Sequence, residues 1–192
     1  MLRDIVIRNR SYRRFYQDHT ITKDELKALV DLARLAPSAA NMQPLKFFVS
    51  ADTVTNTSIF PHLGWAAYLK DWPGPDEGQR PSAYIIILGD THITANFWCN
   101  HGIAAQTILL GAVEQGLGGC MIAAVNRKGL MAALNIPEHL EILLVIALGK
   151  PAEEVRIEAV GPGGDIKYHR DDKGVHHVPK RSLEEIVIEG FS

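Results

Sequence analysis

Cysteine, net charge and long apolar runs are all scarce in this sequence of 192 residues. It contains two cysteines, Cys99 and Cys120, which are too few for a disulfide scaffold and are typical of a reducing compartment. The formal charge of −2 argues against a surface built to bind nucleic acid or an anionic membrane. The longest apolar stretches, near 83–89 and 142–148, are about seven residues long and therefore too short to cross a bilayer.

The beginning of the sequence also lacks the features of a signal peptide, because it is charged by Arg3 and has no long apolar run. What is present is the composition of a soluble globular domain, with 46% hydrophobic and 22% charged residues. The length allows one domain with a substantial core. We therefore expect a cytoplasmic protein with a single domain over residues 1–192 and no nucleic-acid or membrane partner.

Apolar spacing and end signals predict intermixed helices and strands. The helix after Thr22 has a capping box, and it should end at Ala36 because Pro37 forces the preceding residue out of helical geometry. The expected helices are 2–8, 23–36, 64–70, 101–115 and 127–134, and the expected strands are 47–49, 84–88, 120–125 and 143–148. This mixture indicates an α/β or α+β sandwich.

From residue 150 the chain becomes polar and rich in Gly and Pro, which predicts an extended arm over 150–192. The arm ends in a second capping box, at Ser182–Glu185, followed by the apolar run 186–188. Because it has little core of its own, we expect it to wrap a partner subunit. The predicted helix 101–115 is our candidate for the dimer core, since its small residues would let another backbone approach. These residues are Ala104, Ala105, Gly111 and Ala112.

Two basic clusters lie near opposite ends of the chain: Arg10, Ser11 and Arg13 at one end, Lys180 and Arg181 at the other. Guanidinium groups bind phosphate in a bidentate manner, and a serine hydroxyl can complete the shell. The two clusters could converge on one dianion. They could equally be scattered surface charge, and a solvated basic turn is the simpler explanation of the N-terminal cluster taken alone.

The segment 37–44 (PSAANMQP) is a loop by composition. Small residues allow a planar ligand to approach, and the amides of Asn41 and Gln43 offer both donors and acceptors. A helix C-terminal turn with locally satisfied amides is the alternative reading.

Other motifs predict no chemistry. The glycines of 116–119 follow a helix and precede a strand, the reverse of the order in a dinucleotide fingerprint. Cys99 with His101, and His176 with His177, have no second ligand pair at metal spacing, so we expect structural roles and no metal site. Without a convincing nucleophile or carboxylate pair, the reactive group is expected to belong to a cofactor.

Four segments taken together resemble the nitroreductase family of FMN proteins. Residues 9–15 (NRSYRRF) match the family's Arg-Arg-Ser-x-Arg-x-Phe pattern, with Asn9 in place of the first arginine. Residues 36–44 match Ala-Pro-Ser-x-x-Asn-x-Gln-Pro, with Leu45 where tryptophan is usual. Residues 116–124 are similar to the segment that passes the central flavin ring, and residues 179–185 to the family's final basic motif.

The resemblance implies an α+β, nitroreductase-like three-layer sandwich with a central mixed sheet, in an intertwined homodimer. It also implies that Arg10, Ser11 and Arg13 hold the FMN phosphate and ribityl chain, and that Lys180 and Arg181 complete the phosphate site. The partner's copy of the 36–44 loop would lie against the flavin. A backbone N–H of Ala123 or Ala124 would face flavin N5, and Tyr68, Leu69 and Lys70 would line the pyrimidine edge. The implied cofactor-binding residues are Arg10, Ser11, Arg13, Pro37, Ser38, Ala39, Asn41, Gln43, Leu69, Ala123, Ala124, Lys180 and Arg181.

The implied function is an FMN-dependent oxidoreductase. NAD(P)H would deliver hydride to the flavin, and a nitroaromatic, quinone or activated alkene would accept it in a ping-pong cycle. No side chain is expected to act as the catalytic acid or base. The alternatives are a specialised relative, such as a reductive dehalogenase or a flavin-fragmenting enzyme, and an FMN-binding protein without turnover.

Overall fold

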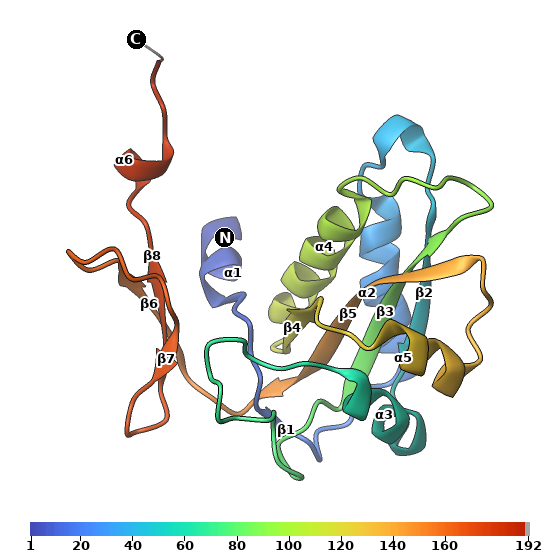
Figure 1. Cartoon of the computed structure of the whole chain (residues 1–192), viewed down its shortest axis with the longest axis horizontal. Helices are drawn as coiled ribbons and strands as arrows, with labels where there is room; N and C mark the ends of the chain where they lie inside the picture. Colours follow the sequence, from blue (N-terminus) through green and yellow to red (C-terminus); the bar gives the residue numbers. More distant parts are fainter. Residues whose placement is uncertain (191–192) are drawn as a thin grey trace.

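The structure is a computed structural model that describes residues 1–190, so the last two residues of the expected arm lie outside it. Its helices and strands alternate as far as residue 151, and three further strands and a short helix follow (Figure 1). The helices are α1 (Leu2–Arg8), α2 (Lys23–Leu35), α3 (Thr53–Ile59), α4 (Asn100–Glu114), α5 (Arg127–Leu134) and α6 (Leu183–Ile186), with short 3-10 turns at Ala39–Asn41 and Phe60–His62. The strands are β1 (Phe15–Tyr16), β2 (Leu45–Ser50), β3 (Ala83–Asp90), β4 (Gly118–Ile122), β5 (Leu140–Pro151), β6 (Val155–Ala159), β7 (His169–Arg170) and β8 (His176–Lys180).

A five-stranded sheet forms the centre of the molecule. Strand β5 lies between β3 on one side and both β4 and β1 on the other, and β2 is paired with β3. Every pair of neighbouring strands in this sheet is antiparallel, so the expectation of a mixed central sheet is wrong for the described chain. The physical reason is the position of β5. It inserts between β3 and β4, which run in the same direction, and pairs antiparallel with both.

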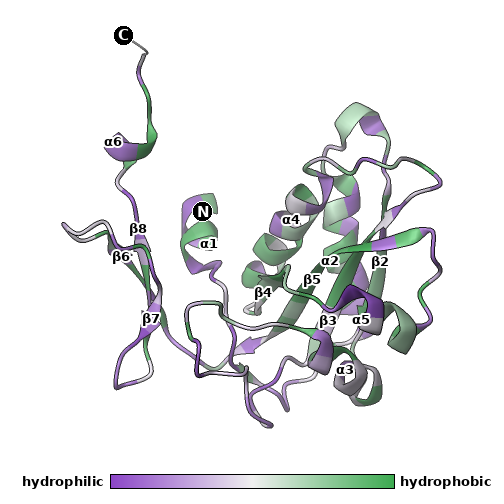
Figure 2. Cartoon of the chain, viewed as in Figure 1, coloured by the Kyte–Doolittle hydropathy of each residue, from purple (hydrophilic) through white to green (hydrophobic). Residues whose placement is uncertain are grey.

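Two apolar clusters lie on the two faces of the sheet, because alternate residues of a strand point to opposite faces. Ile85 and Ile87 of β3 pack with residues of α2 and α4. Tyr84 and Ile86 of the same strand pack on the other face with residues that include Ile59 of α3 and Leu130 of α5. The central strands are hydrophobic through most of their length (Figure 2). The α+β class expected from the sequence is confirmed.

The ends of α2 follow from its sequence. The Thr22 side chain accepts a hydrogen bond from the backbone of Glu25, whose carboxylate accepts from the Thr22 N–H in return. The helix ends at Leu35, with Ala36 in an extended conformation before Pro37. The capping box and the proline stop are therefore both confirmed, and they set the entrance to the following loop.

The small residues of α4 pack inside the core of this chain. Ala104, Ala105 and Ala112 are buried in the cluster beneath α2. A side chain at Gly111 would meet Leu32 of α2 at 2.4 Å. The small face thus lets α2 approach α4 within one chain, and it is not available to a partner backbone as we expected.

Two other local expectations are wrong. The segment 64–70 contains turns in place of a helix, and a lone bridge between Leu63 and Val125 ties its beginning to the chain after β4. Trp65 is buried in the apolar cluster that includes residues of α3 and α5, and its burial holds the segment in place. The strand expected at 120–125 is displaced and covers Gly118–Ile122.

The C-terminal arm extends away from the central sheet (Figure 1). Its strands β6, β8 and β7 form a small separate sheet, in which β6 and β8 are parallel. Its last helix, α6, carries a Ser182 cap as the sequence predicts. Leu183, Ile186 and Ile188 are each more than 60% exposed, although they are apolar. An extended arm of this kind is what the sequence indicates.

Candidate flavin site

Arg13 joins the N-terminal segment to the C-terminal arm. Its side chain is 9% exposed, and Nη1 donates to the Ser11 carbonyl at 3.1 Å and lies 3.3 Å from Nε2 of His176 in β8. The guanidinium also lies over the ring of Tyr168, 4.8 Å from its centre. The N-terminal basic cluster therefore contacts the C-terminal arm in the folded protein.

A buried carboxylate fixes this junction. Glu153 accepts hydrogen bonds from the backbone N–H groups of Arg13 and Arg14, and its other oxygen accepts from Arg170 at 2.9 Å. The Glu153 side chain is 2% exposed. Because Glu153 binds the backbone of Arg13 and the side chain of Arg170, it leaves the guanidinium of Arg13 without a carboxylate partner among the described residues.

A cavity of about 230 Å³ opens beside Arg13. Arg10 and Lys180 also line it, and no ion pair of these three cations occurs within residues 1–190. The buried Nε of Arg10 has no hydrogen-bond partner there either. The lining residues are Asn9, Arg10, Ser11, Arg13, Tyr168, His176, Val178 and Lys180. Three cations and a hydroxyl without an acidic neighbour in the lining make this cavity suited to a dianion.

Burial lowers the pKa values of two residues that line the cavity, His176 and Arg10. It lowers the pKa of His176 to about 4, with the charge of Arg13 adding to the effect, so His176 is neutral at pH 7. Desolvation also lowers the pKa of Arg10. A buried cation without a counter-ion is costly, and an anion in the cavity would relieve that cost.

The loop from Ala36 to Pro44 forms a second cavity of about 170 Å³. Ala40, Asn41 and Gln43 have φ near +50°, a left-handed conformation that is uncommon for residues other than glycine. Hydrogen bonds within the chain hold the loop. The Ser38 hydroxyl accepts from the Gln43 backbone at 3.0 Å, and the Gln43 side chain donates to the Asn41 carbonyl at 3.2 Å.

Asn100, which the sequence reading overlooked, anchors this loop from the start of α4. Its Oδ1 accepts from the Ala39 N–H at 3.1 Å, and it is 3% exposed. Its buried Nδ2 has no partner in the described chain. Pro37, Ser38 and Gln43 line the cavity with Asn100. A polar side chain before an apolar helix was the available signal, but only the fold brings it to residue 39.

Strand β4, which leads to Ala123 and Ala124, lies next to the N-terminal cluster. Ser11 forms a parallel bridge with Gly119, and the Tyr12 N–H donates to the Gly119 carbonyl at 3.0 Å. Ala123 and Ala124 follow β4 and are exposed. The Ala124 carbonyl accepts from Gly64 at 2.7 Å, which fixes the orientation of that peptide.

The 61–81 loop reaches the arm through two tyrosines. The rings of Tyr68 and Tyr168 lie 4.9 Å apart, and the Tyr168 hydroxyl accepts from the Tyr68 N–H at 3.3 Å. Leu69 is half-buried in the turn that follows. Tyr168 therefore connects this loop to Arg13, a link that nothing in the sequence around residue 168 indicates.

The family model of nitroreductases matches residues 7–150. The chain belongs to the nitroreductase family.

The similarity to individual nitroreductases covers most of the chain. The chain is 25% identical to the Bacillus subtilis protein named "Putative NAD(P)H nitroreductase MhqN", over 79% of this chain and 89% of that protein. It is 30% identical to a Methanothermobacter thermautotrophicus protein named "Putative NADH dehydrogenase/NAD(P)H nitroreductase", over 77% of this chain and 76% of that one. These relationships support a general oxidoreductase.

Solved structures show the same fold. A Parabacteroides distasonis protein named "Putative NADH dehydrogenase/NAD(P)H nitroreductase" aligns with a TM-score of 0.70 and 21% identity, over 99% of this chain and 98% of its own. A protein of Clostridium difficile R20291 described as an FMN-dependent nitroreductase aligns with a TM-score of 0.64 and 23% identity, over 78% and 87% of the two chains.

One basic residue of the family's final motif, Arg181, does not line the cationic cavity. Arg181 forms an ion pair with Glu185 on α6, and it is Lys180 that lines the cavity. The role expected for Arg181 stays a prediction. The roles of Ala123, Ala124, Leu69 and the 36–44 loop toward a flavin likewise stay predictions. Leu69, Ala123 and Ala124 do not line the cationic cavity, and that cavity shares no lining residue with the cavity of the 36–44 loop.

The residues considered for metal binding have other partners or none. His176 contacts Arg13, and His177 is hydrogen-bonded by Glu158 and by Asp171. Cys99 is a free, exposed thiol. No helix in the described residues is long and apolar enough to span a membrane.

Proposed function

We propose that this nitroreductase-family chain binds FMN and passes hydride from NAD(P)H to a small electron acceptor. The observation that carries the proposal is the cavity where Arg10, Arg13 and Lys180 meet without an acidic residue in its lining. The FMN phosphate carries nearly two negative charges, and arginine forks bind such a group bidentately. The Clostridium difficile protein described as FMN-dependent supports the choice of flavin.

The residues present fit the cofactor. Arg10, Arg13 and Lys180 would hold the phosphate, and the Ser11 hydroxyl would complete its shell. When bound, the flavin ring supplies the hydride chemistry, as cofactors do in enzymes without a strong nucleophile. A backbone N–H of Ala123 or Ala124 would donate a hydrogen bond at flavin N5. No carboxylate and no protonated histidine lines the phosphate cavity, so protons would come from solvent.

The second half of the site would come from another subunit. The 36–44 loop and the cationic cavity share no lining residue, and the apolar side chains of α6 are exposed. Exposed apolar residues on an extended arm are typical of a surface covered in an oligomer. We propose an intertwined homodimer in which the arm embraces the partner and the partner's Asn41 and Gln43 face the flavin. We also propose that this dimer is cytoplasmic.

Three measurements test the proposal. Purified protein should be yellow, or should take up one FMN per chain, and NAD(P)H should bleach the bound flavin. Steady-state oxidation of NAD(P)H with a nitroaromatic, quinone or activated-alkene acceptor should show the parallel-line kinetics of a ping-pong cycle. A colourless protein that takes up no FMN contradicts the proposal. FMN that stays oxidised with NAD(P)H would instead show an FMN-binding protein without turnover.

A further inference from the structure

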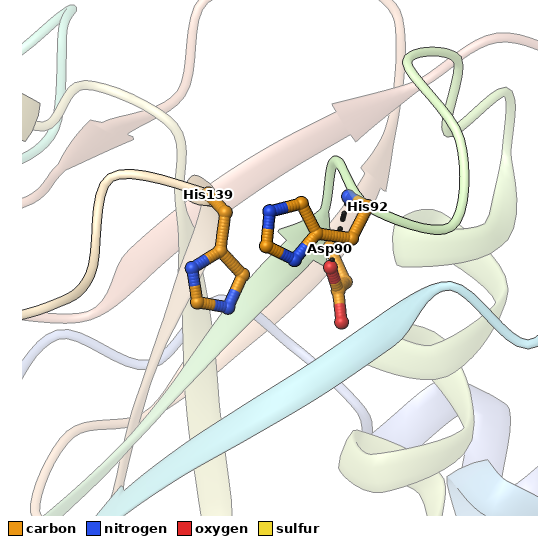
Figure 3. A group of neighbouring side chains, drawn as sticks. All are labelled: Asp90, His92 and His139. Carbon is orange, nitrogen blue, oxygen red and sulfur yellow. Dashed lines mark hydrogen bonds between the residues drawn. The ribbon is translucent and has the colours of Figure 1, made fainter.

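Three side chains able to bind a metal meet where β3 ends and β5 begins (Figure 3). They are Asp90, the last residue of β3, His92 in the turn after it, and His139, directly before β5. One ligand atom of each lies within 4.8 Å of the other two. None of these residues lines either cavity of the candidate flavin site.

Backbone hydrogen bonds hold the three residues together. Asp90 pairs with Leu140 in the register of β3 and β5, which places His139 beside the turn. The N–H and the hydroxyl of Thr91 both donate to the His139 carbonyl, at 2.9 and 2.8 Å. The His92 N–H donates to Asp90 Oδ1 at 3.0 Å. The main chain of the cluster is therefore fixed before any ligand arrives.

The two imidazole rings are at least partly exposed to solvent. They are stacked, with centroids 4.3 Å apart and planes within 1° of parallel. No ring nitrogen of His92 or His139 has a hydrogen-bond partner in residues 1–190, and His92 is exposed. The Asp90 carboxylate is mostly buried, and Lys46 lies 4.0 Å from its Oδ2.

We propose that Asp90, His92 and His139 bind a divalent transition-metal ion such as Zn²⁺. Two imidazoles and one carboxylate suit zinc, nickel, copper or iron, whereas calcium and magnesium require oxygen ligands. Zinc commonly takes three protein ligands and a water. With zinc–ligand bonds of about 2.0–2.1 Å, tetrahedral ligand atoms lie about 3.3 Å apart. The side chains therefore have to close from separations of up to 4.8 Å, which requires the exposed His92 ring and the half-buried His139 ring to rotate.

Metal binding at this cluster would also affect the 36–44 loop. The Asp90 N–H donates to the carbonyl of Pro44, the last residue of that loop, at 2.9 Å. A metal that cross-links Asp90 to His139 would stabilise the turn after β3 and the start of β5 together. It would do so in the protein with or without flavin, which separates this proposal from the proposed function.

The test is a titration of chelator-treated protein with Zn²⁺, in competition with a chromogenic chelator. We expect one Zn²⁺ per chain and a higher midpoint of thermal unfolding, because a ligand that binds only the folded state stabilises it. Co²⁺ in place of Zn²⁺ should give the visible absorption of a tetrahedral site. His92→Ala and His139→Ala should each weaken binding by about tenfold or more and abolish the thermal shift. Both histidines are at least partly exposed, so these variants should fold.

Two further variants make the result specific. His169→Ala removes one ring of the other stacked histidine pair, His169 with His177, and should leave Zn²⁺ affinity unchanged. Lys46→Met removes the cation that competes for Asp90 and should tighten Zn²⁺ binding. Absence of stoichiometric binding, or equal affinity in wild type, His92→Ala and His139→Ala, would overturn the proposal. Loss of binding in His169→Ala alone would place the metal at the other pair and overturn it as well.

Discussion

The cationic cavity and the 36–44 loop differ in how their polar groups are satisfied. In the cavity, Arg10 and Lys180 have no acidic partner among the described residues. In the loop, the backbone N–H groups of Ala39 and Gln43 find acceptors in the same chain. The loop therefore has a preformed shape, whereas the cavity holds charge that only an external anion would balance. Substitutions in the two regions should accordingly change different quantities.

The largest expected effect is on folding, at the buried carboxylate behind the cavity. Glu153→Ala leaves Arg170 buried without its partner and two backbone N–H groups without an acceptor. We expect the free energy of unfolding to fall by about 3–5 kcal/mol. Urea denaturation measures this. Glu154→Ala is the matched control: its ion pair with Arg156 is exposed, so the change should stay under about 1 kcal/mol. Equal effects of the two substitutions would contradict the role of Glu153.

A second effect is the pH dependence of stability that comes from His176. Its pKa is about 4 in the folded protein, below the ordinary value of 6.5, first because of burial. Between these values the unfolded chain binds a proton that the folded chain does not, so stability falls as the pH drops from about 6.5 to 4. The loss is up to about 3 kcal/mol.

Denaturation curves of wild type and His176→Gln across this pH range isolate the contribution. The pKa of His177 is raised by Glu158 and Asp171, which gives a slope of the opposite sign, but that residue is present in both proteins. The difference between the two curves should therefore flatten above pH 6.5. A difference that does not change with pH would show that His176 titrates normally.

The third effect is on flavin retention and not on folding. Arg10→Ala together with Lys180→Ala should weaken FMN binding by about a hundredfold, because two charge-assisted contacts are lost. The free energy of unfolding without flavin should change little. Fluorescence titration with FMN measures the first quantity.

The contrast with Arg181 sharpens that result. Arg10→Ala with Arg181→Ala tests the basic pair that the sequence indicates, whereas the structure pairs Arg181 with Glu185. We expect Arg181→Ala alone to weaken FMN binding less than Lys180→Ala does. The reverse order would mean that Arg181, and not Lys180, contacts the bound phosphate.

The smallest effect is expected in the loop. Ser38→Ala removes the acceptor of the Gln43 N–H at an exposed position, at a cost of about 1 kcal/mol in unfolding free energy. Ala40→Gly relieves a left-handed backbone with φ of 50° and should stabilise the chain by a few tenths to about 1 kcal/mol. Thermal unfolding of both variants checks these opposite signs. If Ala40→Gly destabilises, the loop is not strained.

Elements with strong local signals could be predicted from the sequence. Thr22 and Glu25 fix the start of α2 through side-chain hydrogen bonds, and Pro37 fixes its end sterically. Asn126 caps α5 in the same local way. The segment 64–70 misled the sequence reading because its apolar residues are held by burial of Trp65 and a bridge at Leu63, contacts that are distant in the chain.

The residues of the candidate site likewise divide into those with a local sequence signal and those placed by distant contacts. Arg10, Ser11 and Arg13 stand out because they are clustered in sequence, and Lys180 because it matches a family motif. Glu153, Tyr168 and Asn100 could not be found this way, since each acts on a residue more than 60 positions away. The cluster of Asp90, His92 and His139 was missed for the same reason, because strand register brings His139 to the other two residues.

The sequence by itself determined the ends of α2, the cap of α5 and the family, because these depend on residue types and on short spacings. Only the tertiary structure decided that the N-terminal basic cluster contacts the C-terminal arm at Arg13, and that Lys180, not Arg181, lines the cavity. It also decided that the small face of α4 packs against α2. The physical reason is that burial and charge balance depend on contacts between residues far apart in the chain, and only folding brings such residues together.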